Sequence, residues 1–258
     1  MKKNNLKLSV MCIVFVGSLL TSISFAGEND VQVQENLVFE SGNEKVSLLE
    51  MYSSQGCSSC PPAEKWLNKF TADPGLWKRF IPVVFHVDYW DYLGWKDPYS
   101  DQAYSARQRE FKRQSLIHSV YTPGFVLNGK EWRGWFARKS LPASQQQSGN
   151  LKLDVSGPLI SATYSQFTSK QRLNIALIGF DLNTYVANGE NHQRTLTQEF
   201  VVLDFWQVNP DDGQWTSEWQ TPKADAKSIG IVAWITEGKS LRPLQATGGL
   251  LPIKSKFF

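Results

Sequence analysis

The sequence predicts an α/β domain followed by a smaller all-β, sandwich-like domain. Two observations lead to this prediction. An apolar run, a helical periodicity and a second apolar run follow one another between residues 45 and 90, whereas short strand-like runs without an amphipathic helix fill the chain after residue 150. The chain has 258 residues, which is longer than the about 100–150 residues typical of one domain.

The N-terminal residues predict export. Three lysines among the first seven residues precede an apolar run over residues 8–20, and Ser24-Phe25-Ala26 then offers the small residues of a cleavage site. The apolar run is shorter than the roughly 20 residues that span a bilayer. We therefore expect residues 1–26 to be a cleaved signal peptide and the mature protein to be periplasmic or secreted.

The charge balance argues against two classes of partner. Removing residues 1–26 takes three lysines from the 27 basic residues and leaves all 24 acidic residues, so the mature protein is formally neutral. Neither nucleic acid nor, after signal cleavage, a membrane is expected as a partner. Residues 27–44 are polar and lack periodicity, which predicts a flexible leader.

Residues 45–140 are expected to form the α/β domain. Val46–Tyr52 is short, largely apolar and compatible with a strand, and turn-forming residues follow it. Apolar residues then recur at helical spacing from Ala63 to Phe70. Ile81–Trp90 is a second, nearly continuous apolar run, which is typical of a strand covered on both faces. A helix that connects two such strands predicts a parallel pair.

The following residues predict an inserted helix, a hairpin and then a second domain. Residues 91–119 are rich in aromatic residues and arginine, with helix-like intervals. The strand-like run at residues 125–127 ends at Asn128-Gly129, a strong hairpin signal. Residues 141–150 have the composition of a linker. Short strand-like runs over residues 151–258 then predict the sandwich-like domain.

Cys57 and Cys60 form the motif with the clearest chemistry. They are the only cysteines that signal cleavage leaves, and they open the predicted helix in a Cys-x-x-Cys spacing. Because a helix N-terminus stabilises a thiolate, we expect Cys57 to be the attacking thiol and Cys60 the resolving thiol. We expect a redox-active centre that cycles through a disulfide. A structural disulfide and half of a zinc site are the alternatives.

Several segments resemble a known family. They are residues 50–64 (EMYSSQGCSSCPPAE), residues 85–98 (FHVDYWDYLGWKDP), Tyr121-Thr122-Pro123, Gly189-Glu190-Asn191 and Val232-Ala233-Trp234. Together they look like the secreted bacterial domain-of-unknown-function family numbered 1223. The resemblance implies a thioredoxin-like fold for the N-terminal domain. It also implies a cis-proline loop, in which Thr122 and Pro123 lie against the cysteine pair.

Glu50 and His86 are further candidates. Glu50 interrupts an apolar strand seven positions before Cys57, and a buried carboxylate there would accept the proton of Cys60. The alternative is a strand edge that faces solvent. His86 and Asp88 alternate on one face of the second strand, near the edge where α/β sheets host their sites. Cys57, Cys60 and His86 together would suit Cu(I), whereas the alternative is a hydrogen-bonded core histidine.

These residues predict an exported thiol–disulfide oxidoreductase that uses Cys57 and Cys60, without a cofactor, on an exported protein or a small-thiol partner. Two alternatives are an exported copper chaperone or sensor that uses the same cysteines and His86, and a non-catalytic protein-binding module. The C-terminal residues show no catalytic constellation, so recognition or docking is the role expected of them. Redox direction, physiological partner and oligomeric state do not follow from these patterns.

Overall fold

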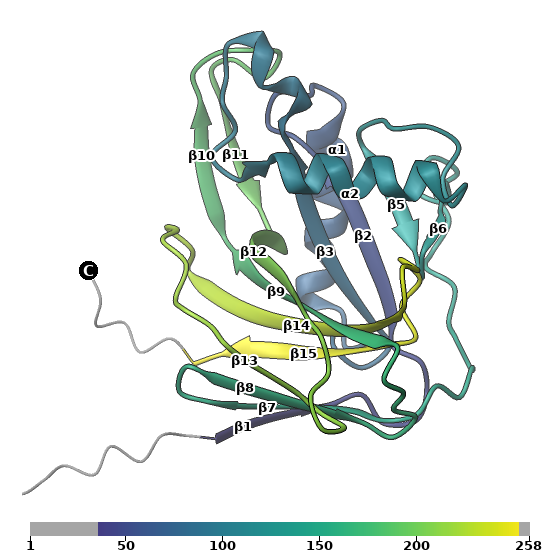
Figure 1. The fold of residues 1–258 in the computed structure, drawn as a ribbon. Coiled ribbons are helices and arrows are strands. Elements are labelled where there is room, and N and C mark those ends of the chain that lie inside the picture. Colours follow the sequence, from purple (N-terminus) through teal and green to yellow (C-terminus); the bar gives the residue numbers. More distant parts are fainter. Residues whose placement is uncertain (1–35, 253–258) are drawn as a thin grey trace, which may run out of the picture. The chain divides into compact units, whose positions relative to one another are not determined.

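A nine-stranded mixed sheet forms the centre of the structure, a computed structural model that describes residues 36–252 (Figure 1). Its strands are β2 (Ser47–Ser53), β3 (Phe80–Val87), β4 (Ser100–Asp101), β5 (Gly124–Leu127), β6 (Lys130–Glu131), β9 (Gln171–Phe180), β12 (Val201–Val208), β14 (Ser228–Glu237) and β15 (Gln245–Leu251). The order is β15-β14-β9-β12-β3-β2-β5-β6, and β4 pairs with β3 in addition. β3 is parallel to β2, β4 and β12, whereas the other neighbouring strands are antiparallel.

A second, antiparallel sheet packs on one face of β9 and β14. Its strands are β1 (Asn36–Glu40), β7 (Leu151–Ser156), β8 (Leu159–Tyr164) and β13 (Trp215–Glu218), in the order β1-β7-β8-β13. Along β7, buried and half-buried side chains alternate, as expected for a strand with one covered face. The buried set, Leu151, Leu153 and Val155, shares a core with Leu177 of β9 and Ile231 of β14.

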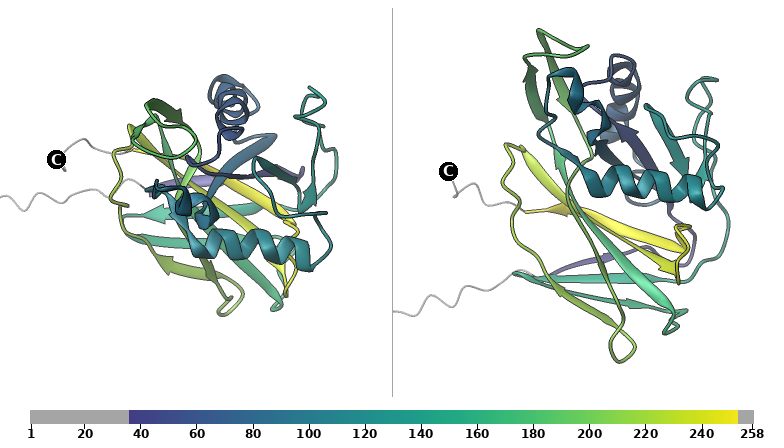
Figure 2. Two further views of the ribbon diagram at one scale, coloured as in Figure 1. Left: turned by 90° about the horizontal axis from the view of Figure 1, so that it is seen from above. Right: turned by 45° about the horizontal axis from the view of Figure 1, so that its top comes forward.

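Helices cover the part of the nine-stranded sheet around β2 and β3. α1 (Cys60–Asn68) and the 3-10 helix η1 (Lys69–Ala72) connect β2 to β3, whereas η2 (Asp88–Leu93) and α2 (Gln102–Arg113) follow β3. α1 and α2 lie on opposite faces of the sheet (Figure 2). β2 and β3 are consequently buried along their whole length, as expected for strands covered on both faces.

A two-stranded hairpin, β10 (Leu182–Val186) and β11 (Arg194–Gln198), lies between β9 and β12 in the sequence. β11 contacts α1, and the Asn68 amide at the end of α1 donates to the carbonyl oxygen of Thr197 at 2.9 Å. The hairpin therefore brings a C-terminal part of the chain to the helix that begins at Cys60.

The predicted thioredoxin-like α/β domain with a separate sandwich-like domain is wrong. Strands make up 43% and helices 14% of the structure, in several sheets, and strands from both halves of the chain share the nine-stranded sheet. Residues 36–252 lie within one compact unit. The reason is visible in β9 and β14, which are buried almost without alternation. Continuous burial marks the interior strands of a large sheet, whereas the faces of a small sandwich would alternate.

Parts of the predicted leader and linker make ordered backbone contacts with the rest of the structure. β1 lies within the expected leader, residues 27–44, and pairs with β7 over its full length. In the expected linker, residues 141–150, backbone groups of Gln146 and Ser148 hydrogen-bond to the residues just before β2. The predicted signal peptide, residues 1–26, lies outside the described residues. Within the described part of the chain, no helix is long and apolar enough to cross a membrane.

Glu50 of β2 and Arg107 of α2 form a buried ion pair in the core. Arg107 donates from Nε to Glu50 Oε2 at 2.8 Å and from Nη2 to Oε1 at 2.9 Å. The Tyr52 hydroxyl donates a third hydrogen bond to Oε2, at 3.0 Å. The guanidinium also lies over the rings of Phe85, Phe111, Phe205 and Trp234. This pair joins α2 to the sheet, and both carboxylate oxygens of Glu50 accept hydrogen bonds in it.

We expect that removing one partner of this ion pair destabilises the protein more than removing both. Arg107→Met leaves the Glu50 carboxylate buried without its counter-ion, which should lower the free energy of unfolding by about 3–5 kcal/mol. The double substitution Glu50→Leu with Arg107→Met removes both charges and should recover most of that loss. Denaturant unfolding followed by tryptophan fluorescence measures both effects. Equal unfolding free energies for the wild type and Arg107→Met would contradict the structural role of the pair.

Candidate active site

Cys57 and Cys60 lie where β2 turns into α1. The chain turns tightly here, because the Cys57 amide donates to the carbonyl oxygen of Ser54 and the Cys60 amide donates to that of Cys57, each at 3.2 Å. α1 begins at Cys60, and prolines follow in its first turn. Proline is tolerated there because the first amides of a helix have no intrahelical partner. The helix predicted to begin at the cysteines is thereby confirmed.

Both cysteines are free thiols, and both are buried. The predicted redox-active centre of a thioredoxin-like fold with a disulfide is therefore wrong on two counts. Cys57 and Cys60 are not joined by a disulfide, and the surrounding fold is mostly β. What the structure holds at this position is a buried dithiol.

The two thiols differ in their tendency to ionise. A hydrogen bond from Cys60, helped by Ser59 and opposed by burial, lowers the pKa of Cys57 to about 6. The hydroxyl oxygen of Ser59 lies 3.2 Å from Cys57 Sγ. Burial, together with the neighbouring Cys57 and Glu64, raises the pKa of Cys60. At neutral pH, Cys57 is therefore the thiolate, which is the nucleophilic form, and Cys60 keeps its proton.

Thr122 and Pro123 belong to the same site. The peptide bond between them is cis, as the family resemblance implies, and the Thr122 carbonyl oxygen lies 3.9 Å from Cys57 Sγ. The indole Nε1 of Trp90 donates to the Thr122 hydroxyl at 2.8 Å, which orients that side chain. The structure thus gathers four predicted site residues around one loop: Cys57, Cys60, Thr122 and Pro123.

Glu50 does not lie at the cysteines. Side chains alternate along a strand, and Glu50 points toward Arg107 of α2, whereas Ser53 points toward α1. Both carboxylate oxygens of Glu50 already accept hydrogen bonds from Arg107. The expected role of Glu50 as proton acceptor for Cys60 is therefore wrong, because the carboxylate lies on the opposite face of the sheet.

Glu64 is the buried carboxylate near Cys60. It lies one helical turn after Cys60 on the same face of α1 and is 4% exposed. Ser53 Oγ donates to Glu64 Oε1 at 2.5 Å, and Gln198 Nε2 donates to Oε2 at 3.0 Å. Burial raises the pKa of Glu64, although His86 and the two donors oppose the shift. The spacing of four residues from Cys60 is the sequence signal that would have found it.

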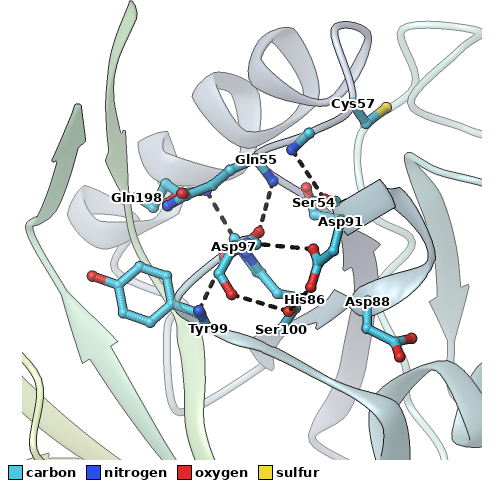
Figure 3. A network of polar contacts seen from close by, with 12 residues as sticks. Ser54, Gln55, Cys57, His86, Asp88, Asp91, Asp97, Tyr99, Ser100 and Gln198 are labelled. Carbon is cyan, nitrogen blue, oxygen red and sulfur yellow. Dashed lines mark hydrogen bonds and ion pairs between the residues drawn. The ribbon is translucent and has the colours of Figure 1, made fainter. Parts of the chain in front are cut away.

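His86 and Asp97 form a buried pair (Figure 3). Glu64 lies beside this pair. His86 Nδ1 lies 2.7 Å from Asp97 Oδ2, and Nε2 lies 3.8 Å from Glu64 Oε1. Asp97 also accepts the backbone amides of Gln55, at 2.7 Å, and Tyr99, at 3.0 Å. Burial opposes the charged form of His86, but Asp97 and Glu64 outweigh it and raise its pKa. Burial likewise opposes charge on Asp97, yet His86 and the amides lower its pKa.

His86 does not face the two sulfur atoms. Its Nδ1 faces Asp97, and its Nε2 faces Glu64 and the amide of Gln198. Among residues 36–252, no three His, Cys, Asp or Glu side chains are arranged as a metal site. The copper alternative built on His86 and the cysteines stays a prediction. Asp88, expected on the same face as His86, instead hydrogen-bonds to Ser105 and lies apart from the His86–Asp97 pair (Figure 3).

The loop between β2 and α1, residues 54–59, carries Cys57, and we call it the cysteine loop. Residues 189–198, which we call the clamp segment, come from the C-terminal half of the chain and hold this loop. Asn191 Nδ2 donates to the carbonyl oxygens of Gln55 and Cys57, both at 2.9 Å. The Glu190 carboxylate accepts the backbone amide of Ser58 at 2.8 Å. These residues include the Gly189-Glu190-Asn191 motif that the sequence singled out without a role. The motif fastens the loop that carries Cys57.

The chain belongs to the family described as "Protein of unknown function (DUF1223)", which matches residues 48–236. This span contains the cysteine loop, Glu64, the His86–Asp97 pair and the clamp segment. The family resemblance noted in the sequence is thereby confirmed. No curated protein matches the chain.

A solved structure of another protein shares the fold. A crystal structure of protein AGR_C_4864 from Agrobacterium tumefaciens is 22% identical, with a TM-score of 0.58, and the match covers 83% of this chain and 98% of that chain. At this identity the likeness concerns the fold alone. A structure titled HBP35 of Porphyromonas gingivalis is 11% identical, with a TM-score of 0.48 and coverage of 83% of this chain and 79% of that chain. That similarity is too distant to bear on fold or function.

We expect the Cys57 thiol to titrate with a pKa of about 6, and we expect this low pKa to require Cys60. Because the hydrogen bond from Cys60 is the largest cause of the low pKa, Cys60→Ala should move the pKa of Cys57 toward its ordinary value of 9.0. Thiolate absorbance in the ultraviolet, followed during a pH titration, reports the ionised form. Cys57→Ser serves as the blank without the transition. A Cys60→Ala protein that still titrates near pH 6 would refute the assignment.

We expect Asn191→Ala to loosen the cysteine loop. The substitution removes the Asn191 donor from the Gln55 carbonyl and leaves the Cys57 carbonyl with the Cys60 amide. A buried group that loses its partner costs about 1–3 kcal/mol, so the protein should lose stability and Cys57 should react faster with a thiol reagent. Reagent kinetics and denaturant unfolding measure the two effects. His192→Ala, at an exposed neighbouring position, is the matched control. Equal Cys57 reactivity in both variants would show that the clamp does not restrain the loop.

Proposed function

We propose that this protein is an exported thiol–disulfide oxidoreductase that exchanges electrons with an exported protein or a small thiol. The observation that carries the proposal is the asymmetry of the buried dithiol. Cys57 has a pKa lowered to about 6, whereas Cys60, at the first position of α1, has a raised pKa. Such a pair combines a nucleophile that is ionised at neutral pH with a resolving thiol that stays protonated until the second step.

The first step is attack on a disulfide. The Cys57 thiolate bonds to one sulfur of the substrate disulfide, and the substrate S–S bond breaks. The displaced substrate sulfur leaves as a thiolate and takes a proton from water. The product is a mixed disulfide between Cys57 and the substrate.

The second step releases the substrate. Cys60 loses its proton, and its sulfur bonds to Cys57 Sγ while the mixed disulfide breaks. The second substrate sulfur leaves as a thiolate and is protonated. Two electrons have then passed from the dithiol of the protein to the substrate, which leaves as two thiols. The reverse sequence oxidises a substrate dithiol, and the difference in reduction potential between the protein and its partner sets the direction.

A reaction of the reduced protein with glutathione disulfide tests this proposal. We expect the wild type to form the Cys57–Cys60 disulfide and to release two equivalents of glutathione. Cys60→Ser should stop at a mixed disulfide, visible in the intact mass as one added glutathione, whereas Cys57→Ser should form none on Cys60. Tryptophan fluorescence confirms that each variant is folded. A folded Cys60→Ser protein that gains no glutathione would overturn the proposal.

A further inference from the structure

The proposed exchange requires Cys60 to lose a proton inside the protein. Cys60 is 0% exposed, so its proton cannot pass directly to water. The ionisable groups near enough to interact with it electrostatically are Cys57, Glu64 and Tyr89. Cys57 is the sulfur under attack in this step. Burial raises the pKa of Tyr89, and its hydroxyl donates to Gln108 at 3.1 Å. Glu64 is therefore the group that can accept the proton.

Ser53 connects Cys60 to Glu64. The Ser53 hydroxyl donates to Glu64 Oε1 at 2.5 Å, and it is near enough to the Cys60 thiol to favour the ionised form of that thiol. Ser53 is completely buried at the end of β2, which fixes the hydroxyl between the thiol and the carboxylate. A hydroxyl can accept one hydrogen while it donates another, so this arrangement forms a path for a proton.

We propose that Glu64 takes the proton of Cys60 through the Ser53 hydroxyl, and that His86 and Asp97 are positioning residues for Glu64; this inference rests on the proposed function. The Cys60 proton bonds to Ser53 Oγ while the Ser53 proton bonds to Glu64 Oε1. Cys60 becomes a thiolate and Glu64 a neutral carboxylic acid, so the net charge of the site does not change. The Cys60 thiolate then displaces the substrate sulfur from Cys57.

The surroundings of Glu64 suit both of its states. Before the transfer, the carboxylate accepts hydrogen bonds from Ser53 and Gln198 and lies 3.8 Å from His86 Nε2. After the transfer, burial favours the neutral acid. No arginine or lysine is among the causes that shift its pKa, in contrast to Glu50 with its bidentate Arg107. A carboxylate without a permanent counter-ion in contact can give up its charge and regain it.

Asp97 keeps His86 in place for this role. Asp97 accepts hydrogen bonds from the amides of Gln55 and Tyr99 as well as from His86 Nδ1, so the imidazole is oriented with Nε2 toward Glu64. The other charged group that acts on His86 is Asp91, which accepts a hydrogen bond from Ser100 Oγ at 2.9 Å. Around Glu64, His86 is thus the partner that favours the ionised carboxylate, and Asp97 orients His86.

The second step should therefore depend on pH through Glu64. A protonated Glu64 cannot accept the Cys60 proton, so the step slows as the pH falls through the raised pKa of Glu64. Above that pKa the carboxylate is ionised and the rate of the step reaches a plateau. Without the carboxylate, the rate should instead keep rising with pH, because only hydroxide or water is left to remove the proton.

Stopped-flow mixing with dithionitrobenzoate, a chromogenic disulfide, separates the two steps. The reduced protein should release a first coloured thiolate when Cys57 attacks and a second when Cys60 displaces it. In Glu64→Gln we expect an unchanged first phase and a second phase slowed about 100-fold or more at neutral pH, the usual loss when a general base is removed. The second phase should also lose its plateau at high pH.

Further variants test the path and its support. Ser53→Ala should slow the second phase, and Ser53→Thr, which keeps the hydroxyl, should restore it. His86→Gln should shift the pH dependence of the second phase without slowing the first. Glu199→Gln is the control, because Glu199 is a half-buried carboxylate beside Gln198 that accepts the Asp181 amide, at 2.9 Å. It should behave as the wild type.

The outcomes distinguish a failure of this inference from a failure of the proposed oxidoreductase function. A wild type that releases no coloured thiolate through Cys57 would contradict the proposed function. A wild type with both phases, together with a Glu64→Gln protein whose second phase has the wild-type rate and plateau, would remove only the role of Glu64. If Glu64→Gln fails to fold, the Ser53 variants decide, since equal second-phase rates in Ser53→Ala and Ser53→Thr would overturn the proton path.

Discussion

The pairing of β12 with β3 is the contact on which the candidate site depends. Val201 of β12 lies beside Val84 of β3, and the Val84 amide donates to the carbonyl oxygen of Phe200 at 2.9 Å. This pairing joins the strands of the second half of the chain to those of the first half in a single sheet. It also carries Gln198, which ends β11 just before β12, to Glu64 of α1. The same hairpin places Asn191 on the cysteine loop.

Two buried glutamates show how the partner of a charge decides its chemistry. Glu50 is held by two nitrogens of Arg107, which form a bidentate ion pair with its carboxylate. Glu64 is also buried, but its hydrogen bonds come from neutral donors, and Nε2 of His86 is 3.8 Å away. A buried ion pair serves structure, because breaking it leaves an uncompensated charge. A buried carboxylate without a contacting cation has a raised pKa, which suits proton transfer at a dithiol.

Asp97 organises the polar side of the site. It joins three separate segments, since it accepts the amide of Gln55 in the cysteine loop, the imidazole of His86 at the end of β3 and the amide of Tyr99 before β4 (Figure 3). A charged hydrogen-bond acceptor with several donors is strong in a buried environment. The loop before Cys57 is consequently held at one end by Asp97 and at the other by the clamp segment.

The sequence by itself determined the local features of this protein. A strand, a turn and a helix around Cys57 and Cys60, and the hairpin signal at Asn128-Gly129, follow from turn chemistry and apolar periodicity, which act between near neighbours. The family also followed from the residues, because its motifs are contiguous in the chain.

The tertiary structure alone decided that one sheet unites both halves of the chain. It also decided that Glu64 rather than Glu50 lies at the dithiol, and that Asn191 and Gln198 complete the site. The physical reason is that strand pairing and the partners of buried charges are contacts between distant residues, and local periodicity shows which face of an element is buried but not what covers it.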